Sequence, residues 1–151
     1  MTNERIERIS EIISFILHLM KNREIFSKTK LVKLLYLLDV VKSRRRIRKF
    51  SGVEYRSYYY GPFSEDIEDS ILLLKSLGHI SVDECRSLSG NSYYHIKLNQ
   101  LPDFGYLSDE DKRDIKKILS PLTDRELNDV LDITYNTKEY KDAPFGEVIS
   151  L

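Results

Sequence analysis

The sequence predicts an α+β fold that is mainly α-helical, with about five helices and a small β-hairpin or sheet. Three observations lead to this prediction. Apolar residues recur at spacings of three and four in several stretches, two short runs are rich in β-branched and aromatic residues, and turn-forming residues separate these runs. The chain has 151 residues, 41% hydrophobic and 32% charged, which suits a single folded domain over residues 1–151.

The first 41 residues predict two helices. Residues 4–21 carry a stripe of isoleucines at helical spacing, so one face of this helix is expected to be buried. Residues 31–41, introduced by Lys28-Thr29-Lys30, are apolar on almost every face, which predicts a helix at the centre of the domain. Lys33 and Asp39 are expected to mark the outer edge of this second helix.

A dense run of positive charge follows the second helix. The cations in it are Lys42, Arg44, Arg45, Arg46, Arg48 and Lys49. Such a run is a candidate contact for nucleic acid or for an acidic partner when its cations converge on phosphates or carboxylates. The alternative is a solvated loop, which we favour because the C-terminal end of a helix attracts positive charge through its dipole.

The distribution of charge along the chain also favours neutralisation within the protein. The 24 Lys and Arg balance 24 Asp and Glu, yet residues 1–100 hold 17 cations and 12 anions, whereas residues 101–151 hold 7 and 12. The two parts therefore carry +5 and −5. We expect the C-terminal carboxylates to attract the N-terminal cations.

Residues 50–63 favour extended structure because they contain Val53 and four tyrosines, and Gly61–Pro62 is expected to end this segment with a turn. The tyrosine rings are expected to pack on the core, with stacking on nucleic-acid bases as the alternative. Ser64 can then cap a helix that ends at Gly78. The residues expected to face inward from this helix are Ile67, Ile71, Leu74 and Leu77.

A β-hairpin is predicted next, from residues 79–86 and 92–99 around a turn at Gly90–Asn91. Helices followed by a hairpin is also the order of elements in a winged helix, a DNA-reading design. Order alone discriminates weakly between these functions.

The C-terminal part predicts two further helices and a tail. Ser108 opens the first helix, which carries Ile115, Ile118 and Leu119, and Pro121 is expected to end it. Thr123 to Glu126 form a capping-box pattern for a helix that runs to about Tyr135. Residues 138–151 are expected to be mostly irregular and to dock on the body through Tyr140, Phe145, Val148 and Ile149.

The sequence lacks the motifs of common catalytic and cofactor sites. Cys85 is the one cysteine and lies near two acidic residues, which disfavour a reactive thiolate, so a structural role is expected. His18 is expected to be a packing residue, and His79 and His95 could approach each other across the hairpin without an evident third metal ligand. No phosphate-binding glycine loop is present. We therefore expect no enzyme activity, no cofactor and no metal.

The N-terminal residues lack a secretory signal pattern, and no stretch is long and apolar enough to span a bilayer. We expect a cytoplasmic protein without a membrane partner.

Several segments, taken together and at their spacing here, carry a family resemblance. They are residues 30–39 (KLVKLLYLLD), 52–55 (GVEY), 60–63 (YGPF), 107–110 (LSDE), 122–127 (LTDREL) and 141–149. Over about residues 10–150 the chain resembles the SocA-like antitoxin family that carries the Panacea domain. Members of that family often have a histidine and a tryptophan after the last helix, where this chain has residues 133–136 (ITYN) and no tryptophan anywhere.

The resemblance implies a mostly helical domain with a small sheet, in a family whose members neutralise partner toxins by direct binding or by presenting them for degradation. It also implies a structural signature at Tyr60, Gly61 and Pro62, without a catalytic role. The expected function is therefore a protein-interaction module that binds a protein partner such as a toxin. The alternative is a winged-helix-like DNA-binding regulator that places the cations of residues 42–49 on phosphates.

Overall fold

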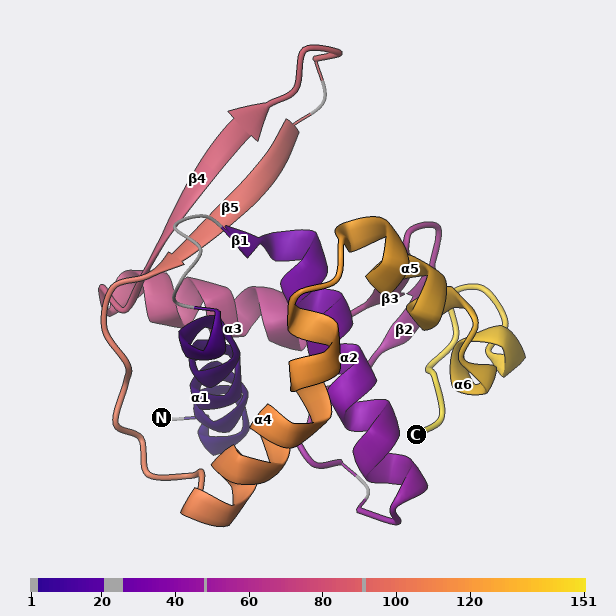
Figure 1. Cartoon of the computed structure of the whole chain (residues 1–151), viewed down its shortest axis with the longest axis horizontal. Coiled ribbons are helices and arrows are strands. Elements are labelled where there is room, and N and C mark those ends of the chain that lie inside the picture. The colour runs from indigo at the N-terminus through magenta and orange to yellow at the C-terminus, as the bar shows by residue number, and fades with distance from the viewer. Residues whose placement is uncertain (1–2, 21–25, 48, 91) are drawn as a thin grey trace.

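The computed structural model describes residues 3–20, 26–47, 49–90 and 92–151, and in these ranges it contains six helices and two small antiparallel sheets (Figure 1). The predicted mainly α-helical α+β fold is confirmed. The helices are α1 (Glu4–Leu19), α2 (Lys28–Arg44), α3 (Glu65–Ser76), α4 (Asp109–Thr123), α5 (Leu127–Tyr135) and α6 (Lys138–Asp142). The strands are β1 (Phe26–Ser27), β2 (Arg56–Tyr58), β3 (Gly61–Phe63), β4 (Ile80–Arg86) and β5 (Ser92–Leu98).

Helix α2 forms the centre of the molecule, as its apolar sequence predicts. It contacts α1, α4 and α5, and Figure 1 shows α1 and α3 on one side of it and α5 on the other. The side chains of α1 and α2 that meet in the core are fully buried: Ile9, Ile12, Ile13 and Ile16, with Leu31, Leu34, Leu35 and Leu38. No helix in the described ranges is long and apolar enough to cross a membrane.

The expectation that Lys33 and Asp39 lie on the outer edge of α2 is wrong, because each is only 5% exposed. The Asp39 carboxylate accepts hydrogen bonds from the Ser51 amide at 3.1 Å, the Ser51 hydroxyl at 2.6 Å and the Tyr55 hydroxyl at 2.6 Å. These bonds hold the segment before β2 against α2. Burial raises the pKa of Asp39 to about 6, because the charged carboxylate loses contact with water.

The segment before α3 forms a hairpin rather than one extended run, and its turn is at Tyr59–Tyr60, not at Gly61–Pro62 as predicted. Strand β2 pairs with β3 so that Tyr58 lies opposite Gly61. Neither loop tyrosine has positive φ, whereas Gly61 has φ +100°. A two-residue loop without positive φ matches the twist of a hairpin when the residue after it takes positive φ. Glycine adopts positive φ with the least backbone strain.

Helix α3 begins as predicted, since the Ser64 hydroxyl accepts a hydrogen bond from the Asp66 amide. Ile67, Ile71 and Leu74 are buried. The prediction that Leu77 faces inward is wrong, because Leu77 lies past the last helical residue and is 52% exposed.

The predicted hairpin of β4 and β5 is confirmed, and it projects away from the helices in Figure 1. Asn91, half of its predicted turn, lies outside the described residues. On the other edge of β5, the described strand β1 pairs with His95 and Ile96.

The C-terminal helices differ from the prediction at their junction. Ser108 forms a full capping box with Asp111 at the start of α4, as predicted. Pro121 does not end the helix but lies inside its last turn, where it removes only one late amide donor. The capping box predicted at Thr123–Glu126 is wrong, because Thr123 lies inside α4, where its hydroxyl donates to the Ser120 carbonyl at 3.2 Å. Helix α5 begins after Glu126 without a side-chain cap.

The tail docks on the hairpin of β2 and β3, and it includes a short helix, α6, where irregular structure was predicted. Ile149 is 3% exposed, and its amide donates to the Tyr55 carbonyl at 2.8 Å. Phe145 stays 58% exposed but its ring contacts Tyr58 and Tyr59. The C-terminal segment thus supports the hairpin that carries the exposed tyrosines.

Candidate functional site

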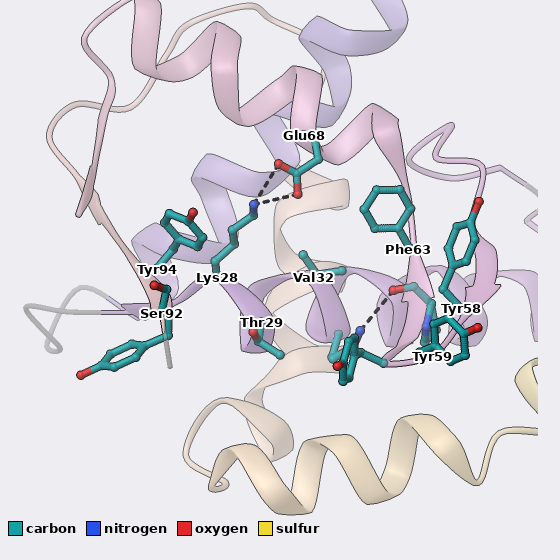
Figure 2. Close-up of a pocket in the computed structure, with 14 residues that line it drawn as sticks. Lys28, Thr29, Val32, Tyr58, Tyr59, Phe63, Glu68, Ser92 and Tyr94 are labelled. Atoms are coloured by element: carbon teal, nitrogen blue, oxygen red, sulfur yellow. Dashed lines mark hydrogen bonds and ion pairs between the residues drawn. The ribbon is translucent and has the colours of Figure 1, made fainter. Parts of the chain in front are cut away.

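A groove of about 550 Å³ lies along α2, between the hairpin of β2 and β3 and the start of β5. We call it the tyrosine groove. Its aromatic lining consists of Tyr58, Tyr59, Tyr60, Phe63, Tyr93 and Tyr94, and the rest consists of Lys28, Thr29, Val32, Lys33, Gly61, Pro62, Glu68 and Ser92. Figure 2 shows Ser92 and Tyr94 at one end, Tyr58 and Tyr59 at the other, and Lys28, Thr29 and Val32 of α2 between them.

The local fold explains why these rings face solvent. Tyr59 and Tyr60 are 83% and 86% exposed because they form the two-residue loop between β2 and β3. The prediction that the tyrosines pack on the core is right for Tyr55, which is 1% exposed and meets the Tyr36 ring edge-on at 5.2 Å. It is wrong for Tyr59 and Tyr60. The sequence carries the signal of three successive tyrosines but not the position of the turn.

The signature Tyr60-Gly61-Pro62 is held by its backbone. The Tyr60 carbonyl accepts a hydrogen bond from the Tyr135 hydroxyl at 3.2 Å, and the Pro62 carbonyl accepts one from Lys33 Nζ at 3.1 Å. A Cβ atom at Gly61 would lie 2.9 Å from the Tyr135 ring, so only glycine fits without displacement. The hairpin is therefore fixed between α2 and α5.

The groove holds two lysines in different environments. Lys28 forms an ion pair with Glu68 at 2.7 Å on one side of the groove, drawn in Figure 2. Lys33 is buried, and desolvation lowers the pKa of its amino group to about 8. The sequence did not indicate Lys33 as a site residue, because a lysine in an otherwise apolar helix is expected to face solvent.

The cationic run after α2 is partly neutralised by the C-terminal part of the chain. Lys42 and Arg45 both pair with Asp114, the latter at 3.3 Å, and Arg44 forms two hydrogen bonds with Glu139 at 2.8 and 2.9 Å. The hydrogen bond from Lys42 lowers the pKa of Asp114, and that from Arg44 lowers the pKa of Glu139. This arrangement matches the predicted attraction between the two oppositely charged parts.

The remaining cations of the run follow the end of α2, so they do not lie on one face of that helix. Arg46 and Lys49 are exposed and have positive φ of 65° and 55°, so the chain turns sharply after α2. Arg48 lies outside the described residues. The structure thus brings three of these candidate residues onto carboxylates and leaves Arg46 and Lys49 facing solvent.

The histidines and the cysteine do not assemble a site. The strand register sets His95 opposite Asp83, and Asn99 donates to the carbonyl of His79, so the expected approach of the two histidines is wrong. Cys85 Sγ lies 3.5 Å from His95 Nδ1. Within the described ranges, no three metal-binding side chains come together.

Comparison with known proteins identifies the family of this chain. No curated protein and no solved structure matches it. The profile of the family described as "Antitoxin SocA-like, Panacea domain" matches residues 31–141, which is more than half of the chain. The match includes both hairpins, α3, α4 and α5, and most of α2. The chain therefore belongs to the SocA-like antitoxin family that carries the Panacea domain.

Proposed function

We propose that this protein is an antitoxin that binds and neutralises a partner toxin, and that the tyrosine groove is its contact surface. The observation that carries the proposal is the group of six aromatic side chains lining one groove, on a chain of this family. Aromatic residues are enriched at the centres of protein interfaces, where a few of them supply most of the binding free energy. The family supports a role without catalysis.

The exposure of the two loop tyrosines supports binding rather than folding as their role. Tyr59 and Tyr60 keep more than four fifths of their surface in water, so their rings contribute little to the stability of the free chain. Their backbone is fixed by the hairpin, and Tyr59 also contacts Phe145 with a ring separation of 4.5 Å. A pre-ordered aromatic side chain loses little conformational entropy on binding, which favours affinity.

We infer that residues 1–151 act as one domain in this function. Helix α1 precedes the matched segment, but its isoleucines share the core with α2 and it contacts α3. We propose the cytoplasm as the place of action, since the single thiol of Cys85 is unpaired and suits a reducing compartment.

The test is a growth assay in which this chain is co-expressed with the toxic protein encoded beside its gene. We expect the native chain to restore growth. The double substitution Tyr59→Ala and Tyr60→Ala should weaken binding by about 30-fold or more, because one hot-spot residue contributes about 2 kcal/mol. The matched control is Leu72→Ala with Leu77→Ala, which truncates two exposed side chains on the α3 side, outside the groove.

Two results would contradict the proposal. If the native chain does not restore growth, the antitoxin role is wrong. If the tyrosine and leucine variants restore growth and bind equally well, the tyrosine groove is not the contact surface.

A further inference from the structure

One wall of the tyrosine groove contains a buried positive charge. Lys33 is 5% exposed, and of its three N–H groups one donates to the Pro62 carbonyl at 3.1 Å. No carboxylate of the described residues lies within ion-pair distance of its amino group. Lys42 is buried to a similar degree, at 3% exposed, but it has a counterion because it pairs with Asp114.

The charge on Lys33 favours an anion as the occupant of the groove. A buried ammonium group without a counterion is costly, and a carboxylate placed next to it offsets that cost. Glu68 does not serve this purpose, since it pairs with Lys28 at 2.7 Å. The net charge of the groove lining is therefore +1, and it resides on Lys33.

The other end of the groove offers a free strand edge. Strand β5 pairs with β4 along its whole length, and on its opposite edge the pairing that involves described residues is that of His95 and Ile96 with β1. After β1 the chain turns into α2 at Lys28, so no described strand covers the edge of Ser92, Tyr93 and Tyr94. An extended peptide can add to such an edge through backbone hydrogen bonds, while neighbouring pockets select its side chains.

Helix α2 connects the two features, because Lys28 Nζ lies 5.2 Å from the centre of the Tyr94 ring and Lys33 follows on the same helix. From Lys28 to Lys33, α2 rises about 7.5 Å, and each extended residue covers about 3.3 Å. We propose that the groove binds an extended acidic segment of the partner, which pairs with Ser92–Tyr94 and sets an aspartate or glutamate side chain against Lys33 two to three residues further along (~3.3 Å each). This inference rests on the proposed function, because the segment belongs to the neutralised partner. Aromatic or aliphatic side chains flanking the acid would pack on Phe63, Tyr58 and Tyr94.

The test uses a random library of peptides displayed on phage, selected against the folded chain. The enriched peptides should carry an acidic residue between apolar residues that alternate along the sequence. One enriched peptide is then synthesised with its acid and with the matching amide, and both are titrated by fluorescence polarisation. On the native chain the amide form should bind at least about tenfold more weakly, the change typical of losing a charged hydrogen bond.

Substitutions in the chain then test whether Lys33 is the charge that recognises the acidic side chain. In Lys33→Met, which keeps the side-chain length, acid and amide peptides should bind equally. In Lys75→Met, the same change at an exposed lysine of α3 outside the groove, the tenfold preference should persist. A measurement on the native chain gives independent support: bound peptide should slow amide hydrogen exchange across Ser92–Tyr94.

The inference is overturned if no peptide is enriched, if enriched peptides lack an acid, if the native chain binds both forms equally, or if exchange across Ser92–Tyr94 is unchanged. Failure here is separate from failure of the antitoxin role. Restored growth with Lys33→Met at native potency would leave the proposed function standing and refute the acidic segment alone. The expected peptide results without restored growth would leave the groove specificity standing and refute the toxin as partner.

Discussion

Replacing Gly61 by alanine tests whether the close approach of the hairpin to α5 stabilises the fold. Gly61 has φ +100°, and an added Cβ atom would lie 2.9 Å from Tyr135 Cε1 and 3.2 Å from Lys33 Nζ. Both the backbone conformation and the space therefore oppose a side chain. The ring of Tyr135 is held by its hydroxyl on the Tyr60 carbonyl, so it cannot move away freely.

The magnitude follows from a comparison with Gly78, which caps the end of α3. Gly78 has φ +78° and nothing within 4 Å of an added Cβ atom, so Gly78→Ala should cost only the backbone strain, about 1 kcal/mol. Gly61→Ala combines backbone strain of about 1–3 kcal/mol with crowding of about 1–3 kcal/mol. We expect it to destabilise the protein by about 2 kcal/mol more than Gly78→Ala does.

The assay is thermal unfolding followed by far-ultraviolet circular dichroism, since the chain has no tryptophan. For a chain of this length each kcal/mol lowers the melting temperature by about 2–4 °C, so the two variants should differ by roughly 4–8 °C. In a Tyr135→Ala background, Gly61→Ala should destabilise the protein by about 1 kcal/mol less than it does in the native chain, because the two sites are coupled. Equal melting temperatures for the two glycine variants, or no coupling, would refute the argument from close approach.

Three further predictions follow from the buried carboxylate, the caps and the cationic run. Because the pKa of Asp39 is about 6 in the folded chain and 3.8 ordinarily, the folded state holds its proton more firmly, so the free energy of unfolding should fall by about 3 kcal/mol between about pH 4 and pH 6 and stay level above that. Urea unfolding across this range should show the slope in the native chain and not in Asp39→Asn, and an identical slope in both would contradict the assignment. Ser108→Ala should lower the free energy of unfolding by about 1 kcal/mol, and Thr123→Ala should lower it by less than about half of that, because only Ser108 caps a helix. Equal melting temperatures for the two variants would contradict this expectation. Duplex DNA should not bind appreciably in gel shifts at about 50 or 200 mM salt, because carboxylates neutralise part of the run, and binding that salt and Arg45→Glu both abolish would contradict this expectation.

Elements that depend on interactions between neighbouring residues could be predicted from the sequence. The isoleucine spacing of α1, the cap of Ser64 on α3 and the box of Ser108 on α4 each act within one helical turn, so a local pattern is sufficient. The same holds for the hairpin of β4 and β5, whose strand propensity and turn residues are adjacent in the chain. The family could also be recognised from the sequence, because its characteristic segments keep their order and spacing.

The residues of the candidate site could not be predicted in this way, because they are brought together by contacts between distant segments. Lys33 and Asp39 are buried because Pro62, Ser51 and Tyr55 cover them, and these partners lie 12 to 29 residues further along the chain. Tyr55 and Tyr59 have the same side chain and sit four residues apart, yet one meets Tyr36 in the core and the other forms a loop. Composition carries no such information, because burial depends on which distant element packs over a residue. The groove arises in the same way, where strand β5, the β2–β3 hairpin and α2 meet.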